Sequence, residues 1–328
     1  MNRLALSSSA FACVAIIATQ GCQPRHRGAD WVVGAPQGTV IALSGQAGWM
    51  IQRPEFQRAL HEFPLAEQAL DLFLKRAHID PASETGRLTF YAMDLYAKSS
   101  IQGSNFLLQL SHFKDPKNLM VAVTEAFPME GSLQTTKGEL PLHVLFDYNT
   151  IHVRMAFDTE DNVWIGDLAA LGRLNQPRAA SPATVRASQW IDAQAPFQGL
   201  LLTEDLLKNL SADLDKHSLR EISKDLPKGI EALAWSVAPA ASKEAPHQFS
   251  LALAGTPEGI SQVSPWMHRL VAMIGALPGG SSRPADLLEE RTRAGLKVQL
   301  TQAQLELVMS RFLQQSLQRD PQAPVTKL

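Results

Sequence analysis

The chain of 328 residues is poor in cysteine and in aromatic residues, and it has no excess of charge of either sign. Its two cysteines exclude a disulfide-framework fold and any four-cysteine zinc or iron–sulfur site. The formal net charge of −2 removes the broad basic footprint of a nucleic-acid-binding protein. Hydrophobic residues make up 45% of the sequence, a globular proportion that excludes wholesale disorder. A length of this order fits one large or two modest domains.

The motifs of several enzyme classes are also missing. The sequence contains no Gly-x-Ser-x-Gly, His-Glu-x-x-His, Walker or Gly-x-Gly-x-x-Gly pattern. Ser111-His-Phe-Lys114 is a Ser-x-x-Lys tetrapeptide, but the other elements of penicillin-binding enzymes do not follow it in order. We therefore expect no cofactor and favour a non-enzymatic protein.

The N-terminal segment is typical of an export signal. Arg3 precedes an uncharged stretch whose apolar centre, Ala10 to Ala18, is shorter than the roughly 20 residues that a membrane-spanning helix needs. The stretch ends Ala18-Thr-Gln-Gly-Cys22, which resembles the lipobox of bacterial lipoproteins, where a cysteine after a small residue is acylated once the signal is removed. The resemblance implies a signal peptide over 1–21 and lipid attachment at Cys22. The alternative is a plain secretory signal with an incidental cysteine.

Cleavage before Cys22 would leave a mature chain without a free thiol, because Cys13 leaves with the signal and Cys22 carries lipid. Residues 22–30 would form a tether to the membrane. Gln23 is not the aspartate associated with inner-membrane retention, which favours the outer membrane facing the periplasm. A secreted or periplasmic soluble protein is the alternative location.

The remaining sequence predicts an α+β fold with a mostly antiparallel sheet. Two halves, 31–174 and 189–317, each show the order strand, helix, hairpin, helix, strand, helix. An aperiodic linker is expected at 175–188 and a flexible tail at 318–328. The alternative to two similar halves is one continuous sheet that both share.

Individual elements follow from local patterns. Helices are expected to begin near Pro54, Pro64, Asp115 and Thr256, and a further helix after the capping box Thr301–Gln304. Other helices are expected at 168–174 and 204–214. Hairpins are expected at 87–97 with 105–113, 140–146 with 151–157, and 230–237 with 248–254, and single strands at 39–43, 162–165, 199–202 and 296–300.

One candidate site lies on the hairpin at 140–157. Alternation places Val144 and Phe146 on the same face as Val153 and Met155. The opposite face then carries the four polar residues His143, Asp147, His152 and Arg154. Two histidines and a carboxylate could bind a divalent metal weakly, but the positive charge of Arg154 disfavours it, so no metal is expected. The alternatives are the dispersed site of an exported hydrolase and a solvated polar face without a function.

The segment Phe73-Leu-Lys-Arg-Ala-His-Ile-Asp-Pro81, followed by a hairpin that begins near Arg87, resembles a Thr-Gly-Ile-Asp-Pro element of exported bacterial proteins of the acidobacterial type. The later strand Val163–Asp167, which ends in Gly-Asp, is similar to one in the same proteins. Ala77-His78 stands here in place of Thr-Gly. The resemblance implies no activity and supplies no catalytic residues.

These observations predict an envelope lipoprotein with a binding or interaction role. Its partner would be a protein, or an apolar ligand held between sheet and helices, and its membrane contact would be the lipid on Cys22. An exported hydrolase and a structural component of an envelope assembly are the alternatives.

Overall fold

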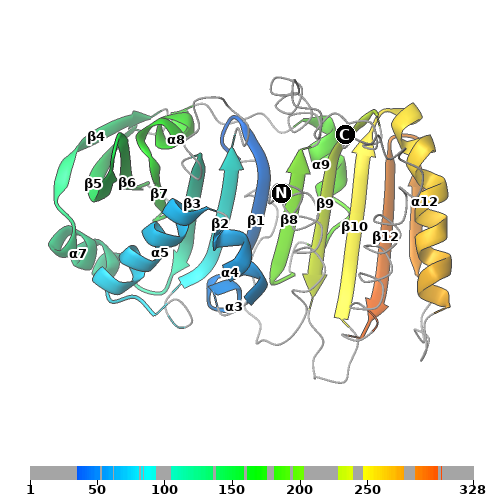
Figure 1. Cartoon of the computed structure of the whole chain (residues 1–328), viewed down its shortest axis with the longest axis horizontal. Coiled ribbons are helices and arrows are strands. Elements are labelled where there is room, and N and C mark those ends of the chain that lie inside the picture. The colour runs from blue at the N-terminus through cyan, green and yellow to red at the C-terminus, as the bar shows by residue number, and fades with distance from the viewer. Residues whose placement is uncertain are drawn as a thin grey trace, which may run out of the picture.

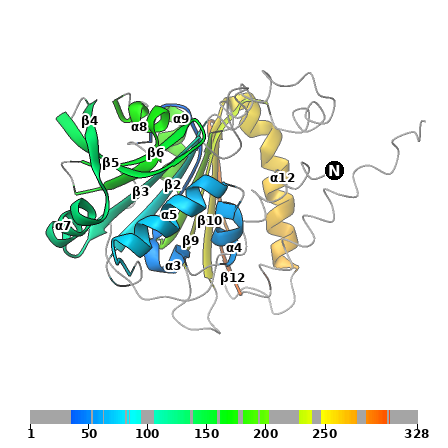
Figure 2. The same ribbon diagram turned by 60° about the vertical axis from the view of Figure 1, so that its left-hand side comes forward.

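The computed structural model contains one antiparallel sheet of 12 strands with helices on both faces (Figures 1 and 2). The structure describes residues 35–51, 54–61, 63–80, 83, 85–93, 105–135, 138–158, 161–175, 181–192, 195–202, 228–238, 247–276, 285–301 and 304. The strand order is β11-β12-β10-β9-β8-β1-β2-β3-β7-β6-β5-β4, so β1 and β8 lie side by side near the middle. The fold is therefore α+β, and both parts of the chain share one sheet.

The first part of the chain supplies one side of the sheet. Its elements are β1 (Thr39–Gln46), α3 (Ala47–Ile51), α4 (Pro54–His61), α5 (Pro64–Arg76), β2 (Thr85–Met93), β3 (Phe106–Phe113), α7 (Pro116–Ala126), β4 (Met129–Thr135), β5 (Gly138–Tyr148), β6 (Ile151–Phe157), β7 (Val163–Asp167), α8 (Leu168–Gly172) and the 3₁₀ helix η1 (Arg173–Asn175). The second part supplies the other side, with α9 (Pro182–Ser188), β8 (Phe197–Leu202), β9 (Ile230–Ala238), β10 (His247–Gly255), α12 (Pro257–Gly275), β11 (Asp286–Glu290) and β12 (Arg293–Leu300).

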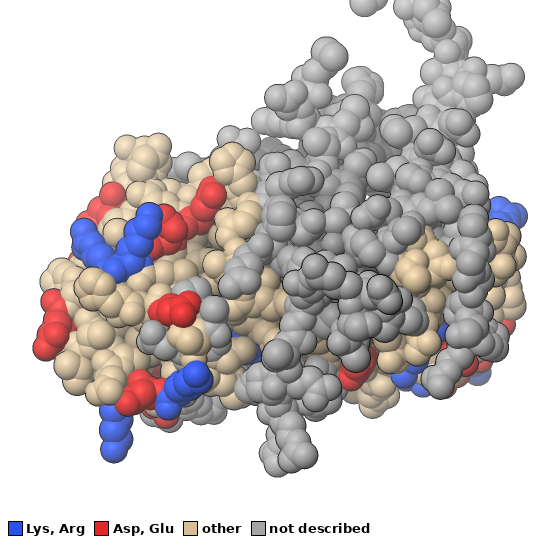
Figure 3. Space-filling model, turned by 90° about the horizontal axis from the view of Figure 1, so that it is seen from below, with Lys and Arg blue, Asp and Glu red and all other residues tan. Residues whose placement is uncertain are grey.

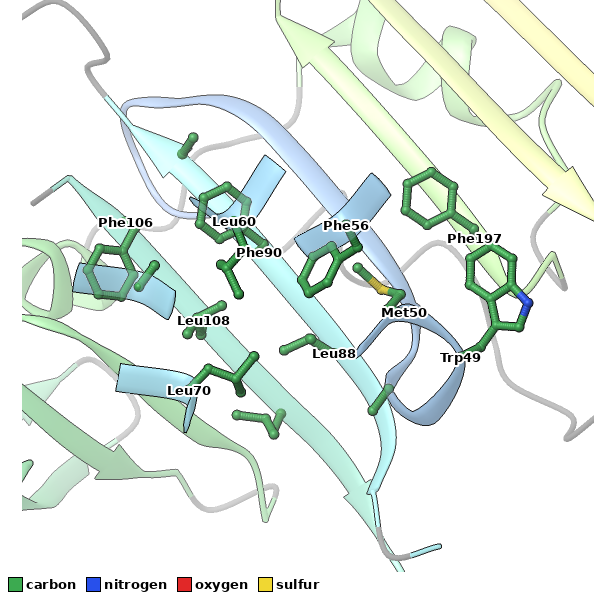
Figure 4. Close-up of a cluster of buried hydrophobic side chains, with 14 of the residues drawn as sticks. Trp49, Met50, Phe56, Leu60, Leu70, Leu88, Phe90, Phe106, Leu108 and Phe197 are labelled. Atoms are coloured by element: carbon green, nitrogen blue, oxygen red, sulfur yellow. The ribbon is translucent and has the colours of Figure 1, made fainter. Parts of the chain in front are cut away.

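The helices divide between the two faces of the sheet. We call the face covered by α3, α4, α5, α7 and α12 the front face, and the face covered by α8 and α9 the back face (Figure 2). The front face buries large side chains, including Phe90, Phe106 and Phe197 (Figure 4). The back face under α9 buries small ones, such as Ala234 and Ala252, which lets this short helix approach the strands closely.

The junction between β1 and β8 depends on close packing. The pairs run from Ile41 opposite Leu201 to Gly45 opposite Phe197. Trp49 packs against Phe197 with ring centroids 5.9 Å apart, so α3 covers both strands at the junction (Figure 4). A Cβ atom on Gly199 would lie 2.0 Å from the Trp235 ring, so only glycine leaves room for that indole.

A row of buried polar side chains crosses the back face through the same junction. Direct cross-strand pairing aligns Thr89, Ser44, Gln198, Ser236 and Ser250 on five successive strands. Ser44 and Thr89 share a 2.8 Å hydrogen bond, and the Gln198 amide donates to the Ala195 carbonyl at 3.1 Å. Hydrogen bonds of this kind lower the cost of burying polar groups on each side of the junction.

Many expected elements are confirmed, including the helix starts at Pro54, Pro64, Pro116 and Pro257. The Thr301–Gln304 capping box forms, because Thr301 N–H donates to Gln304 Oε1 at 3.0 Å and Gln304 N–H donates to Thr301 Oγ1 at 3.3 Å. The expected helices at 204–214 and after Gln304, the signal peptide, the tether with Cys22, and the tail lie outside the described residues.

Two features differ from the sequence expectations. The predicted linker at 175–188 is not wholly aperiodic, because Ser181 caps α9 through Thr184 N–H at 3.1 Å and Ala183 and Ala187 pack on the sheet. Strands β4 and β11 were not expected from the sequence. Both are edge strands with mostly exposed side chains, so neither shows a clear alternation of apolar and polar residues.

Candidate functional site

The polar residues predicted on the β5–β6 hairpin do not all share one face. Asp147 pairs with His152, and Val144 pairs with Arg154, so Asp147, His152 and Arg154 lie on the back face. His143 instead pairs with Met155, whose side chain belongs to the front core. The expectation that His143 joins the other three is therefore wrong.

A β-bulge explains the difference. The register between β5 and β6 shifts between Val144 and Phe146, so Leu145 is an extra residue on β5. Side chains alternate between the two faces of a sheet with a period of two. One extra residue therefore moves every side chain on one side of the bulge to the opposite face. The strict alternation expected from the sequence held from Phe146 to Tyr148 but failed from Leu142 to Val144.

His143 is a buried core residue with a satisfied hydrogen bond. Its side chain is 3% exposed, and Nδ1 donates to the Phe127 carbonyl at 3.1 Å. Its ring meets Phe157 edge-on with centroids 6.1 Å apart. The residue closes the C-terminal end of α7 against β5, and this accounts for the side chain without a ligand.

The remaining back-face residues form what we call the Arg154 cluster, made of Arg154, Asp147, His152 and Glu130. Arg154 Nε and Nη2 donate to the two carboxylate oxygens of Glu130, the latter at 3.0 Å. Nη1 donates to Asp147 Oδ1 at 2.6 Å and to the Val153 carbonyl at 3.1 Å. His152 Nδ1 lies 3.0 Å from the same Asp147 oxygen.

Glu130 was not expected in this site, because β4 was not predicted. It lies at a register shift between Met129 and Gly131, so a second bulge aims its side chain at Arg154. The only sequence signal was indirect: an arginine on a sheet face needs carboxylate partners, and Asp147 alone leaves most of the guanidinium donors without an acceptor.

The electrostatics of the Arg154 cluster follow from burial of the cation. The Arg154 side chain is 3% exposed, whereas Glu130, Asp147 and His152 are each about half exposed. The hydrogen bonds from Arg154 lower the pKa of Glu130, and those from Arg154 and then His152 lower the pKa of Asp147. The hydrogen bond to Glu130 is the largest cause of the raised pKa of Arg154. Glu130, Asp147 and Arg154 are therefore held in their charged forms.

This arrangement suits an ion network better than a catalytic or metal site. A His–Asp pair supports catalysis when the histidine also reaches a nucleophile or a bound water. Here Asp147 Oδ1 is shared between His152 and the Arg154 guanidinium, which occupies the oxygen a metal would need. Across the described part of the chain, no three His, Cys, Asp or Glu side chains come together as a metal site.

A second cluster lies at the opposite edge of the sheet. Ser264 on α12 donates to Glu289 Oε1 on β11, and His268 Nε2 lies 3.0 Å from the same oxygen. The hydrogen bond from Ser264 is the main cause that lowers the pKa of Glu289. The carboxylate stands between Ser264 and His268, the wrong order for a histidine that activates a serine. We call these three residues the Glu289 clamp, since they join α12 to β11.

The carboxylate of Asp158 is hydrogen-bonded to residues of the turn that follows it. Asp158 Oδ1 accepts Asn162 N–H at 3.0 Å, and Oδ2 accepts the Asn162 side-chain amide and Trp164 Nε1–H, each at 2.8 Å. Both carboxylate oxygens therefore serve the turn between β6 and β7. This supports a structural turn rather than the start of a calcium-binding loop.

A groove among the described residues lies between α4 and α5. Its volume is about 340 Å³, at the lower end of the range for small-molecule sites. Leu60 and Leu70 form its buried floor, and Glu67 and Asp71 stand at its rim. The rim carboxylates already contact basic side chains of the same helices, His61 at 3.0 Å and Lys75 at 2.6 Å.

No helix within the described ranges is both long enough and apolar enough to span a membrane. Comparisons of the chain with protein-family models, curated proteins and solved structures gave no match.

Proposed function

We propose that the protein is a lipid-anchored envelope protein with a non-enzymatic interaction role. The observation that carries the proposal is Cys22, which follows Gly21 at the end of an apolar N-terminal stretch. The chain has one other cysteine, Cys13, and it lies within that stretch. The outer membrane, with the folded part in the periplasm, is the proposed location.

The Arg154 cluster supports a non-enzymatic role, because its residues were the candidate site of a hydrolase and are bonded to one another instead. Its cation is buried and bonded to carboxylates and backbone carbonyls, and its histidine shares an acid that the cation already holds. These contacts stabilise an edge of the sheet, which suits a rigid surface for binding a partner.

We also propose that the two parts of the sheet are versions of one repeated unit. From β1 outward the order is β1-β2-β3-β7-β6, and from β8 outward it is β8-β9-β10-β12-β11. In each part a hairpin, β2–β3 or β9–β10, is followed by a front-face helix, α7 or α12. The matching order supports a repeat, which suits a component of an envelope assembly.

The anchor is tested by replacing Cys22. Cys22→Ala should release the protein from the membrane fraction and remove the mass of the acyl groups. Cys13→Ala is the matched control, since it should leave both the lipid and the fractionation unchanged. Unaltered mass and fractionation of Cys22→Ala would refute the lipid anchor.

A bound small ligand is the second candidate role, and the groove between α4 and α5 is its candidate site. Native mass spectrometry of protein extracted from its own envelope should then show a bound molecule. Leu74 lines the groove, so Leu74→Trp should displace the molecule, whereas Lys297→Trp, on the back face far from the groove, should not. A bare mass for the unaltered protein would count against this role.

A further inference from the structure

The chain enters the sheet at one defined end of the central strand β1. Ala35 is the first described residue and is 2% exposed. Thr39 N–H donates to the Pro36 carbonyl at 3.2 Å, and Thr39 Oγ1 donates to it at 2.7 Å. The turn before β1 is therefore fixed to the sheet.

The entry is also fixed from the back face. Arg173 Nη1 donates to the Gln37 carbonyl at 3.3 Å, which places η1, and α8 just before it, beside the entering chain. Leu168, the first residue of α8, is 40% exposed. An exposed leucine and an arginine thus lie close to the point where the chain enters.

The strand register shows what else lies at this end, which we call the tether end. Thr39 pairs with Met93, Ile41 with Leu201, and Gly255 with Ile230, so the start of β1 is level with the ends of β2, β8 and β10. The exposed Lys228 lies just before β9 at the same level. The opposite end, onto which Figure 3 looks, carries the end of β3 at Phe113 and the exposed Lys114.

We infer that the tether end, including α8, faces the lipid bilayer, and this rests on the lipid anchor proposed at Cys22. Cys22 precedes Ala35 by 13 positions. A random coil of 13 residues would have a root-mean-square end-to-end distance of about 20 Å. Strand β1 has eight residues, so the sheet is about 26 Å long in this direction.

The comparison of these lengths favours this orientation. The tether end lies within the average reach of the anchor, whereas the opposite end lies one strand length further away. Leu168 can contact the acyl boundary, and Arg173 and Lys228 can approach headgroups. The opposite end then points toward the periplasm.

Single cysteines test this orientation, because the lipidated chain would hold no other thiol. Leu168→Cys and Lys228→Cys report the tether end, and Lys114→Cys is the matched site at the opposite end. Each full-length lipidated protein is labelled with a fluorescent maleimide in phosphatidylglycerol–phosphatidylethanolamine vesicles that contain a headgroup quencher. We expect quenching at the two tether-end sites to exceed that at Lys114→Cys by about twofold or more.

Equal quenching at both ends would overturn the orientation and leave the anchor intact. Failure of the anchor itself is separately visible, because the unaltered protein would then react with maleimide at Cys22 and carry no acyl mass. A Cys22→Ala version of each labelled protein should lose the quenching. Persistence at the tether end without the lipid would mean that the folded surface alone binds membranes, which would overturn the dependence on the tether.

Discussion

At one edge of the sheet, β4 is attached by Arg154, a cation with a side chain 3% exposed that donates to Glu130, Asp147 and backbone carbonyls. At the other edge, β11 is attached to α12 by the Glu289 clamp, where Glu289 and His268 are 40% and 57% exposed. Both edges therefore use a carboxylate that bridges two elements. They differ in the exposure of the group that binds the carboxylate: Arg154 is buried, whereas water can reach and replace His268.

That difference sets the expected energetics. Solvent screens exposed pairs and they contribute little to stability, whereas removing one member of a buried pair leaves uncompensated groups behind. The Arg154 guanidinium also satisfies the Val153 carbonyl, so its loss affects the strand as well as the ion pairs. The two edges thus offer a controlled comparison within one sheet.

The largest effect is expected from Arg154→Met, which keeps much of the apolar stem and removes the guanidinium. It should lower the free energy of unfolding by about 1–3 kcal/mol, because the Val153 carbonyl and the two carboxylates lose the hydrogen bonds that the buried guanidinium donates. Urea denaturation followed by tryptophan fluorescence measures the change. Arg291→Met, in the exposed turn between β11 and β12, is the control and should change stability little. Equal losses in both variants would remove the distinction between buried and exposed cations.

A second test uses acid. The pKa values of Glu130 and Asp147 are lowered in the folded protein by hydrogen bonds from Arg154. Carboxyl groups with a lowered folded pKa stabilise the fold above their unfolded pKa, near 4, and this contribution is lost as the pH falls through the folded pKa. The thermal unfolding midpoint should therefore fall when the pH is lowered below about 4. Glu130→Gln should flatten this dependence, and an unchanged acid profile would contradict the assignment.

Asp167, next to the Arg154 cluster on β7, should show the opposite sign. Its carboxylate caps α8 through Ala170 N–H at 2.6 Å, and burial raises its pKa. A carboxyl with a raised folded pKa favours the folded state at low pH and loses that contribution as the pH rises through the folded pKa. Asp167→Asn keeps a good cap without the charge. Its thermal midpoint should be equal to or above that of the unaltered protein at pH 7, and this advantage should vanish at pH 3.

The smallest effect is expected from Glu289→Gln in the exposed clamp. The change should move the urea midpoint by less than about a quarter of the shift caused by Arg154→Met, since exposed pairs contribute little. Glu258→Gln, on the exposed surface of α12, is the matched control. A loss as large as that of Arg154→Met would show that both edges depend on their ion pairs equally.

Much of the fold followed from local patterns. The prolines at Pro54, Pro64, Pro116 and Pro257 marked helix starts, because proline is tolerated in the first turn. The central strands were recognisable because both of their faces are covered and their apolar runs are long. The edge strands β4 (Met129–Thr135) and β11 (Asp286–Glu290) were not recognisable. Most of their side chains are exposed to solvent, so their sequences show no apolar pattern.

The candidate site was predictable only in part. Asp147, His152 and Arg154 were placed together correctly, because the alternation between them is regular. The prediction placed His143 on the wrong face because no residue of β5 indicates the bulge. Glu130 was missed because it lies on a strand that the sequence did not predict. Both errors come from register, which depends on the neighbouring strand.

The amino-acid sequence by itself determined the α+β class, several helix starts and the exclusion of a disulfide-framework fold, because these depend on local preference and composition. Tertiary structure alone decided that β1 and β8 join both parts into one sheet, that Arg154 finds Glu130, and that His143 enters the core. These outcomes depend on contacts between residues far apart in the chain, where packing and strand register select among locally equivalent arrangements.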